Sequence, residues 1–124
     1  YIKCRQTTRI CGSVDIDDTL KQACPNDSRW DYGIGWKLNS GVEEAIWVEI
    51  HPANSSHVKD MIQKVEWLKN WLKTNASPLL TISRTKDGYM WIATVSIYLQ
   101  RGSQQARQLA LAGVSFPIKH LQLK

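Results

Sequence analysis

The sequence has few cysteines and no long apolar segment. Its three cysteines are Cys4, Cys11 and Cys24, and none follows position 24. An odd number of thiols at one end makes a poor disulfide framework, which favours a reducing compartment and predicts a cytoplasmic protein. No apolar run is long enough to span a membrane, and no secretory signal pattern is visible. Because the chain begins at Tyr1 rather than at a methionine, a removed leader is left open.

Several common signatures of function are also missing. There is no glycine-rich phosphate loop, no serine nucleophile elbow and no zinc-finger spacing. We find no internal repeat, linker or low-complexity stretch. With 124 residues, the chain is long enough for one domain with a real core and too short for two. We therefore predict a single domain over residues 1–124.

Acidic residues are fewer than basic ones, 11 against 16, which gives a net charge of +5. A basic balance favours a polyanionic partner such as DNA or RNA. Many basic proteins bind no polyanion, so the alternative of an ordinary surface charge stays open. Six tryptophans are expected to fill much of the core.

Hydrophobic periodicity and turn residues predict a mixed α/β domain, a central mixed sheet flanked by helices. The expected order is helix, two strands, helix, two strands, helix and strand. The ranges are a helix over 13–20, strands over 30–38 and 45–51, a helix over 58–73, strands over 79–84 and 89–99, a helix over 104–112 and a strand over 114–123.

The first strand pair predicts an acidic hairpin. In residues 30–38 every second residue is apolar, and Ile46, Val48 and Ile50 alternate with Trp47 and Glu49 on the second arm. Antiparallel pairing must put both apolar sets on one face. A three-residue loop over 39–41 satisfies this and sets Asp31 opposite Glu49. A two-residue loop would instead set Asp31 opposite Ile50, and the two apolar sets would no longer share one face.

Two opposed carboxylates repel each other, and a shared cation or proton relieves that repulsion. Asp31, Glu49 and the carbonyl of Ile50 could bind Mg²⁺ or Mn²⁺, and His51 could orient water or act as a base. Gly33 and Gly35 would leave room for a ligand. The alternative is that the acids face solvent and that the glycines make room for Trp47.

An acid on one strand, a Glu-x-basic motif on its partner and a following helix together resemble the PD-(D/E)XK nuclease superfamily. Asp31 matches the family aspartate, and residues 47–51 match the motif strand. The resemblance implies a restriction-endonuclease-like fold and Mg²⁺- or Mn²⁺-dependent hydrolysis of DNA or RNA, with Asp31, Glu49 and His51 as catalytic residues.

The chain departs from the family pattern at two places. Arg29 and Trp30 stand where the family often has proline, and His51 holds the place of the family lysine. Either His51 takes that role, or Lys59 or Lys64 of the next helix reaches the site, or the site is inactive. A further acid on the first helix could come from Asp15, Asp17 or Asp18, although such acids more often face the helix dipole.

We therefore predict a metal-dependent nuclease. The first alternative is an inactive nuclease-like module that binds nucleic acid or a protein partner. The second is an interaction protein whose acids hold no metal. Because so small a domain has little surface for reading a base sequence, specific cleavage would need a homodimer or an associated specificity subunit.

Overall fold

The computed structural model describes residues 2–4, 10–15, 30–37, 40–84 and 88–123. Its elements follow a mixed α/β order. They are β1 (Ile2–Cys4), β2 (Ile10–Asp15), β3 (Tyr32–Lys37), β4 (Glu43–Asn54), the 3₁₀ turn η2 (Ser55–His57), α2 (Val58–Asn75), α3 (Ser77–Ile82), β5 (Tyr89–Tyr98), α4 (Gln104–Ala112) and β6 (Leu121–Leu123). The predicted mixed α/β class is confirmed.

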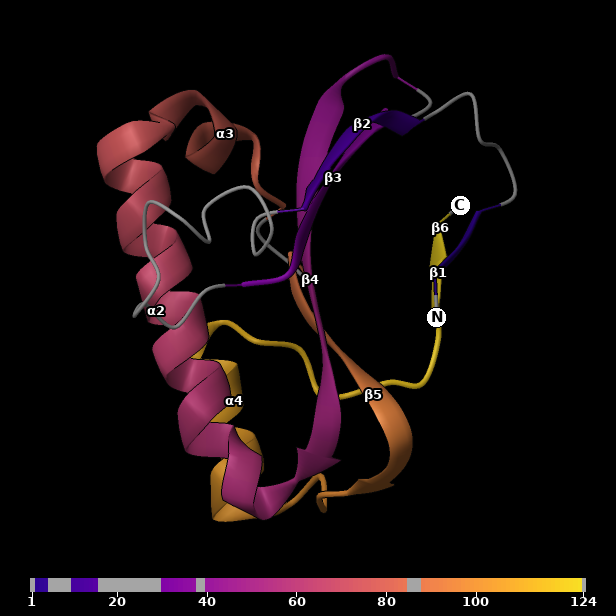
Figure 1. The fold of residues 1–124 in the computed structure, drawn as a ribbon, viewed down its shortest axis with the longest axis vertical. Coiled ribbons are helices and arrows are strands. Elements are labelled where there is room, and N and C mark those ends of the chain that lie inside the picture. Colours follow the sequence, from indigo (N-terminus) through magenta and orange to yellow (C-terminus); the bar gives the residue numbers. More distant parts are fainter. Residues whose placement is uncertain (1, 5–9, 16–29, 38–39, 85–87, 124) are drawn as a thin grey trace.

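The central sheet has the strand order β2-β3-β4-β5. Strands β2, β3 and β4 are antiparallel neighbours, and β5 runs parallel to β4. The sheet is therefore mixed, as predicted. Strands β1 and β6 form a separate parallel pair. Figure 1 shows that α2, α3 and α4 lie on one side of the sheet and the β1–β6 pair on the other. Among the described residues, the expected helices thus cover one face of the sheet.

The β3–β4 hairpin has the register that alternation predicts. Tyr32 pairs with Val48, and Ile34 pairs with Ile46. Gly41 has φ +86°, the left-handed conformation that three-residue hairpin loops often need at this place. Leu38, the last residue of the predicted strand, and Asn39, the first residue of the predicted loop, lie outside the described residues.

Both faces of the sheet are buried, and each has its own core. The face toward the helices packs Ala45, Trp47 and Trp91 against the apolar stripe of α2, whose members are Val58, Met61, Val65, Leu68 and Leu72. The opposite face is aliphatic apart from Trp36 and Met90, and its buried members are Ile34, Trp36, Ile46, Val48, Met90, Ile92 and Leu121. The helix predicted over 58–73 is confirmed by α2, and its apolar stripe packs against this face of the sheet.

The strand predicted over residues 79–84 is wrong. Residues Ser77–Ile82 form α3, with Pro78 in its first turn, where proline costs no hydrogen bond. Thr81 and Ser83 donate hydroxyl hydrogen bonds back to the Ser77 and Leu79 carbonyls, four residues earlier, a contact that the helical turn makes possible. Strand β5 therefore pairs with β4 instead of forming a hairpin with this segment.

Two further ranges need correction. Residues 13–15, expected to open a helix, end strand β2, and residues 16–20 lie outside the described part of the chain. The strand expected over 114–123 is reduced to isolated bridges at Val114 and Ile118 followed by β6. The helix predicted over 104–112 and the long strand after position 88 are confirmed by α4 and β5.

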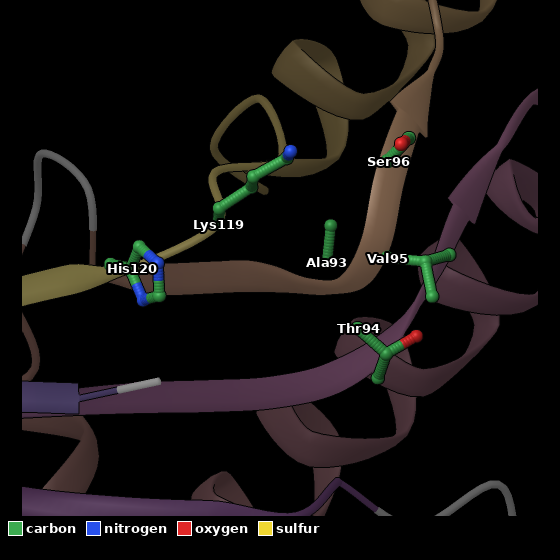
Figure 2. A pocket seen from close by; sticks show the side chains of 6 residues that line it. All are labelled: Ala93, Thr94, Val95, Ser96, Lys119 and His120. Carbon is green, nitrogen blue, oxygen red and sulfur yellow. The ribbon is translucent and has the colours of Figure 1, made fainter.

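A bulge interrupts the β4–β5 pair. His51 pairs with Ala93 and Ala53 with Ile97, so that Thr94 to Ser96 face only Pro52, which has no amide hydrogen to donate. Together with Ala93, Lys119 and His120, the bulged residues line a pocket of about 320 Å³ (Figure 2).

Candidate functional site

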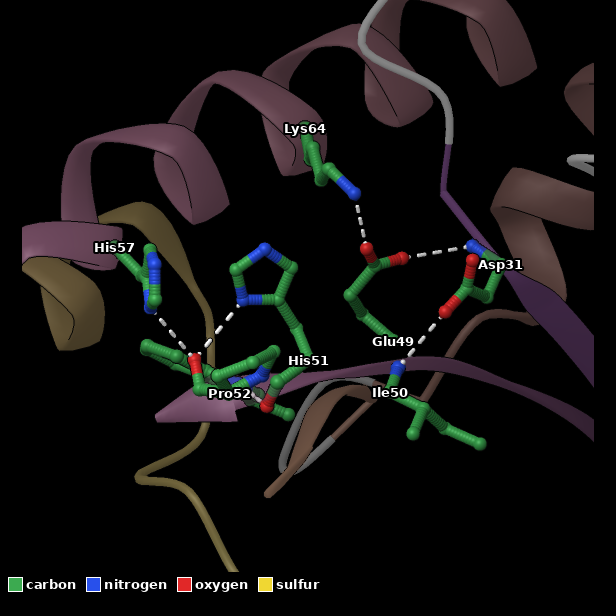
Figure 3. Close-up of polar contacts among 8 residues, drawn as sticks. Asp31, Glu49, Ile50, His51, Pro52, His57 and Lys64 are labelled. Atoms are coloured by element: carbon green, nitrogen blue, oxygen red, sulfur yellow. Dashed lines mark hydrogen bonds and ion pairs between the residues drawn. The ribbon is translucent and has the colours of Figure 1, made fainter. Parts of the chain in front are cut away.

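The structure brings Asp31 and Glu49 together at the end of the β3–β4 hairpin. The ladder pairs Tyr32 with Val48, and hydrogen bonds join the next residues along. The amide of Asp31 donates to Glu49 Oε2 at 2.8 Å, and the amide of Ile50 donates to Asp31 Oδ2 at 2.9 Å. Each carboxylate thus accepts a backbone amide from the opposite arm, and both point into one space (Figure 3).

Trp30 fixes the start of this arrangement. Its side chain is fully buried, and its ring meets that of Tyr89 edge to face at 6.4 Å between centroids. Because the Trp30 side chain is locked in the core, the backbone of Asp31 is held against Glu49. The tryptophan that stands in place of the family proline therefore anchors the first acid.

Lys64 completes the cluster from helix α2. Its Nζ forms an ion pair and hydrogen bond with Glu49 Oε1 (Figure 3). The side chain of Glu49 is only 1% exposed, whereas that of Lys64 is 24% exposed. Lys64 is one of the two lysines expected to reach the site. The other, Lys59, is exposed and lines a groove between α2 and α4.

Burial controls the charge of Glu49. Removal from water raises the pKa of its carboxyl from an ordinary 4.5 to about 7, and the nearby charge of Asp31 adds to the rise. The Lys64 ammonium and the Asp31 amide act in the opposite direction. Glu49 therefore exchanges its proton close to neutral pH, and any cation bound there competes with that proton.

The face that carries Glu49 differs from expectation. It lies opposite the Ile46–Val48 stripe, as predicted, but α2 covers it, and Trp47 beside it is 2% exposed. Gly33 makes room for Trp47: a Cβ at Gly33 would lie 2.4 Å from Trp47 Cζ3. At this glycine the alternative expectation, space for tryptophan rather than for a ligand, is confirmed.

His51 lies beside this cluster, two residues after Glu49 on β4. Its Nδ1 is 2.9 Å from the carbonyl oxygen of Pro52, and its own carbonyl accepts the Trp91 indole hydrogen at 3.0 Å. Its ring meets that of His57 edge to face at 4.6 Å between centroids. His57 occupies the N-cap position of α2 but forms no side-chain cap bond.

The donor set suits a hard cation better than a soft one. Two carboxylates and the backbone oxygen of Ile50 are ligands that Mg²⁺ and Mn²⁺ prefer. Among the described side chains, no group of three His, Cys, Asp or Glu could hold a metal ion. Asp15 ends strand β2 opposite Tyr32 and is therefore not on a helix, while Asp17 and Asp18 lie outside the described residues.

Comparison with known proteins gives no match to a family model, to a curated protein or to a solved structure. In the described part of the chain, no helix combines the length and the apolar character needed to cross a membrane. Interpretation of the site thus depends on the chemistry of Asp31, Glu49 and Lys64.

Proposed function

We propose that the protein is a Mg²⁺- or Mn²⁺-dependent nuclease that hydrolyses DNA or RNA phosphodiester bonds. The observation that carries the proposal is the cluster of two carboxylates from paired strands with a lysine from the next helix. The order β3, β4, α2, α3, β5, α4 around a mixed sheet also supports a restriction-endonuclease-like fold of the PD-(D/E)XK type, although α3 stands where a strand was predicted.

Each residue has a distinct role in this proposal. Asp31, Glu49 and the Ile50 carbonyl would hold the cation, which when bound lowers the pKa of water and stabilises charge on phosphate. Lys64 takes the place of the motif lysine, because a compact ammonium at this point can stabilise developing negative charge. His51, next to the cluster on β4, would orient the attacking water or stabilise charge.

The buried Glu49 makes a pH dependence part of the proposal. The pKa of its carboxyl is raised to about 7, so cleavage should increase as pH rises through neutrality and the proton leaves. Cation affinity should increase over the same range, because proton and metal compete for one carboxylate.

The decisive experiment measures nicking of plasmid DNA and cleavage of RNA with Mg²⁺ and with Mn²⁺. Asp31→Asn, Glu49→Gln and Lys64→Met should each lower the rate by about 10²-fold or more, the usual loss for one electrostatic stabiliser. Lys59→Met is the matched control on the same helix and should retain the wild-type rate. Absence of metal-dependent cleavage of both nucleic acids would refute the nuclease assignment.

A second candidate is an inactive nuclease-like module that binds nucleic acid or a protein partner. The observation in its favour is that Glu49 is 1% exposed and that both its oxygens already accept hydrogen bonds. Buried ion-pair networks with a purely structural role also shift pKa values. Nucleic-acid binding that survives Asp31→Asn, without a metal-induced rise in Tm, would select this module over the enzyme. A homodimer or an associated specificity subunit would supply the reading surface in either case.

A further inference from the structure

Two histidines converge on one backbone oxygen at the end of β4. The Nδ1 atoms of His51 and His57 lie 2.9 and 3.0 Å from the carbonyl oxygen of Pro52. The rings meet edge to face, at an interplanar angle of 83° (Figure 3). Both side chains are partly exposed. Two imidazole nitrogens therefore lie within hydrogen-bond distance of one backbone oxygen at the surface.

The fold holds both rings in place. Trp91 on β5 donates its indole hydrogen to the His51 carbonyl, and its ring lies 6.3 Å from that of His51. On the other side, Asn54 Oδ1 accepts the Ser56 amide at 3.0 Å, which fixes the turn that carries His57. A strand and a capped turn thus position the donors before any ligand arrives, which is what a binding site requires.

The two nitrogen–oxygen separations, 2.9 and 3.0 Å, are close to those between neighbouring ligands on one metal ion. Metal–nitrogen bonds of about 2.0–2.1 Å place two donors roughly 3 Å apart at a right angle and roughly 3.4 Å apart at the tetrahedral angle that Zn²⁺ prefers. If both contacts were instead hydrogen bonds, both rings would carry their proton on Nδ1 and would share one acceptor.

We propose that His51 Nδ1, His57 Nδ1 and the Pro52 carbonyl oxygen bind a first-row transition metal such as Zn²⁺ or Ni²⁺. Imidazole favours these ions, whereas the carboxylates of Asp31 and Glu49 favour Mg²⁺. Three protein donors leave positions open for water or for an anionic ligand. His51 also has a role in the proposed nuclease, where it would orient water, but the metal ligands of the two sites are different atoms, so binding at the histidines can be tested whether or not the nuclease proposal holds.

Calorimetric titration with Zn²⁺ and with Ni²⁺ tests this site. His51→Ala and His57→Ala should each weaken binding by about tenfold or more, because each removes one of three donors. His120→Ala is the matched control, since it removes the third histidine of the chain, and it should bind as the wild type does. The three cysteines are common to all these proteins and cancel in the comparison.

Two further measurements keep the test decisive where a variant folds poorly. Asp31→Asn should retain Zn²⁺ binding, which separates this site from the carboxylate site. Nitrogen-15 NMR of the unmodified protein should show Zn²⁺ shifting the Nδ1 resonances of two histidines. Resonances that keep the Nδ1–H form when Zn²⁺ is added, or equal affinity in the wild type, His51→Ala and His57→Ala, would overturn the proposal.

Discussion

The two faces of strand β4 are both buried, but the side chains that they bury differ in polarity. Ile46 and Val48 enter a core of apolar side chains, whereas Glu49 on the other face is the one buried charged residue among those described. The first face gains free energy from removing apolar area from water. The second must offset the cost of burying a carboxyl, and Lys64 and the Asp31 amide do so. The comparison teaches that one face of the strand depends on apolar packing alone, whereas the other depends on the pairing of a single buried carboxyl.

The largest pH-dependent effect among the variants is expected from breaking the ion pair on the helix-covered face. Lys64→Met leaves Glu49 buried without its cation, so its carboxyl, whose pKa is about 7 in the wild type, keeps its proton at higher pH. Keeping this proton costs about 1.4 kcal/mol for each pH unit above the pKa, so the free energy of unfolding should fall by up to about 3 kcal/mol at pH 9. At pH 5 the carboxyl is protonated in both proteins, so the loss should fall below about 1 kcal/mol. Urea unfolding at both pH values measures the difference. An equal loss at pH 5 and pH 9 would show that the ion pair is not the cause.

Substitutions on the aliphatic face should change the free energy of unfolding by the same amount at both pH values. Ile46→Ala removes a fully buried side chain and should cost about 2–5 kcal/mol at both pH values, because it deletes apolar contacts and leaves a cavity. Val95→Ala, at a residue 59% exposed, is the control and should change stability by less than about 0.5 kcal/mol. A loss of stability in Ile46→Ala that changes with pH would contradict the view that this face depends on apolar packing alone.

Glu49 should also give the wild-type protein a pH-dependent stability. The unfolded carboxyl titrates near pH 4.5 and the folded one near pH 7. The folded state therefore binds the proton more tightly, and the free energy of unfolding should fall by roughly 3 kcal/mol as pH rises from 4.5 to 7. Glu49→Gln should remove this fall. Glu44→Gln, at a side chain 25% exposed on the same strand, should retain it in thermal unfolding curves.

The smallest effect is expected at the glycine under Trp47. Gly33→Ala would force the Trp47 ring to move, which should cost about 1–3 kcal/mol and alter tryptophan fluorescence. Gly102→Ala introduces a methyl group with no atom within 4 Å and should leave both stability and fluorescence nearly unchanged. If the two variants behave alike, close packing of Trp47 on β3 is not what requires glycine.

Sequence patterns predicted the parts of the fold that obey one local rule. The alternation of apolar and polar residues predicted that Ile46 and Val48 lie on one face of the hairpin, and the register that follows places Asp31 beside Glu49. Helical periodicity gave α2 because one stripe of it meets the sheet. The short apolar segment over 79–84 has no such period, and the strand predicted there is a helix, while β5 pairs in parallel with β4.

The chemical details of the site were harder to predict, because they depend on packing between distant elements. The sequence offered two lysines on one helix, but only the rotation of α2 over the sheet selects Lys64. The pairing of His51 with His57 depends on the turn after Pro52, which brings two separated residues edge to face. The signal that could have revealed it is a histidine on either side of a proline at the junction of strand and helix.

The side chains proposed to bind metal ions or to take part in cleavage all lie in one stretch of chain, from Asp31 before β3 to Lys64 on α2. During synthesis, this stretch leaves the ribosome before β5, whose Trp91 donates a hydrogen bond to the His51 carbonyl. The candidate site residues are thus close together in the sequence, but their final alignment depends on β5, which follows them in the chain. Exchange of the outer strand could therefore retune the geometry of the cluster while leaving the chemistry of its members unchanged.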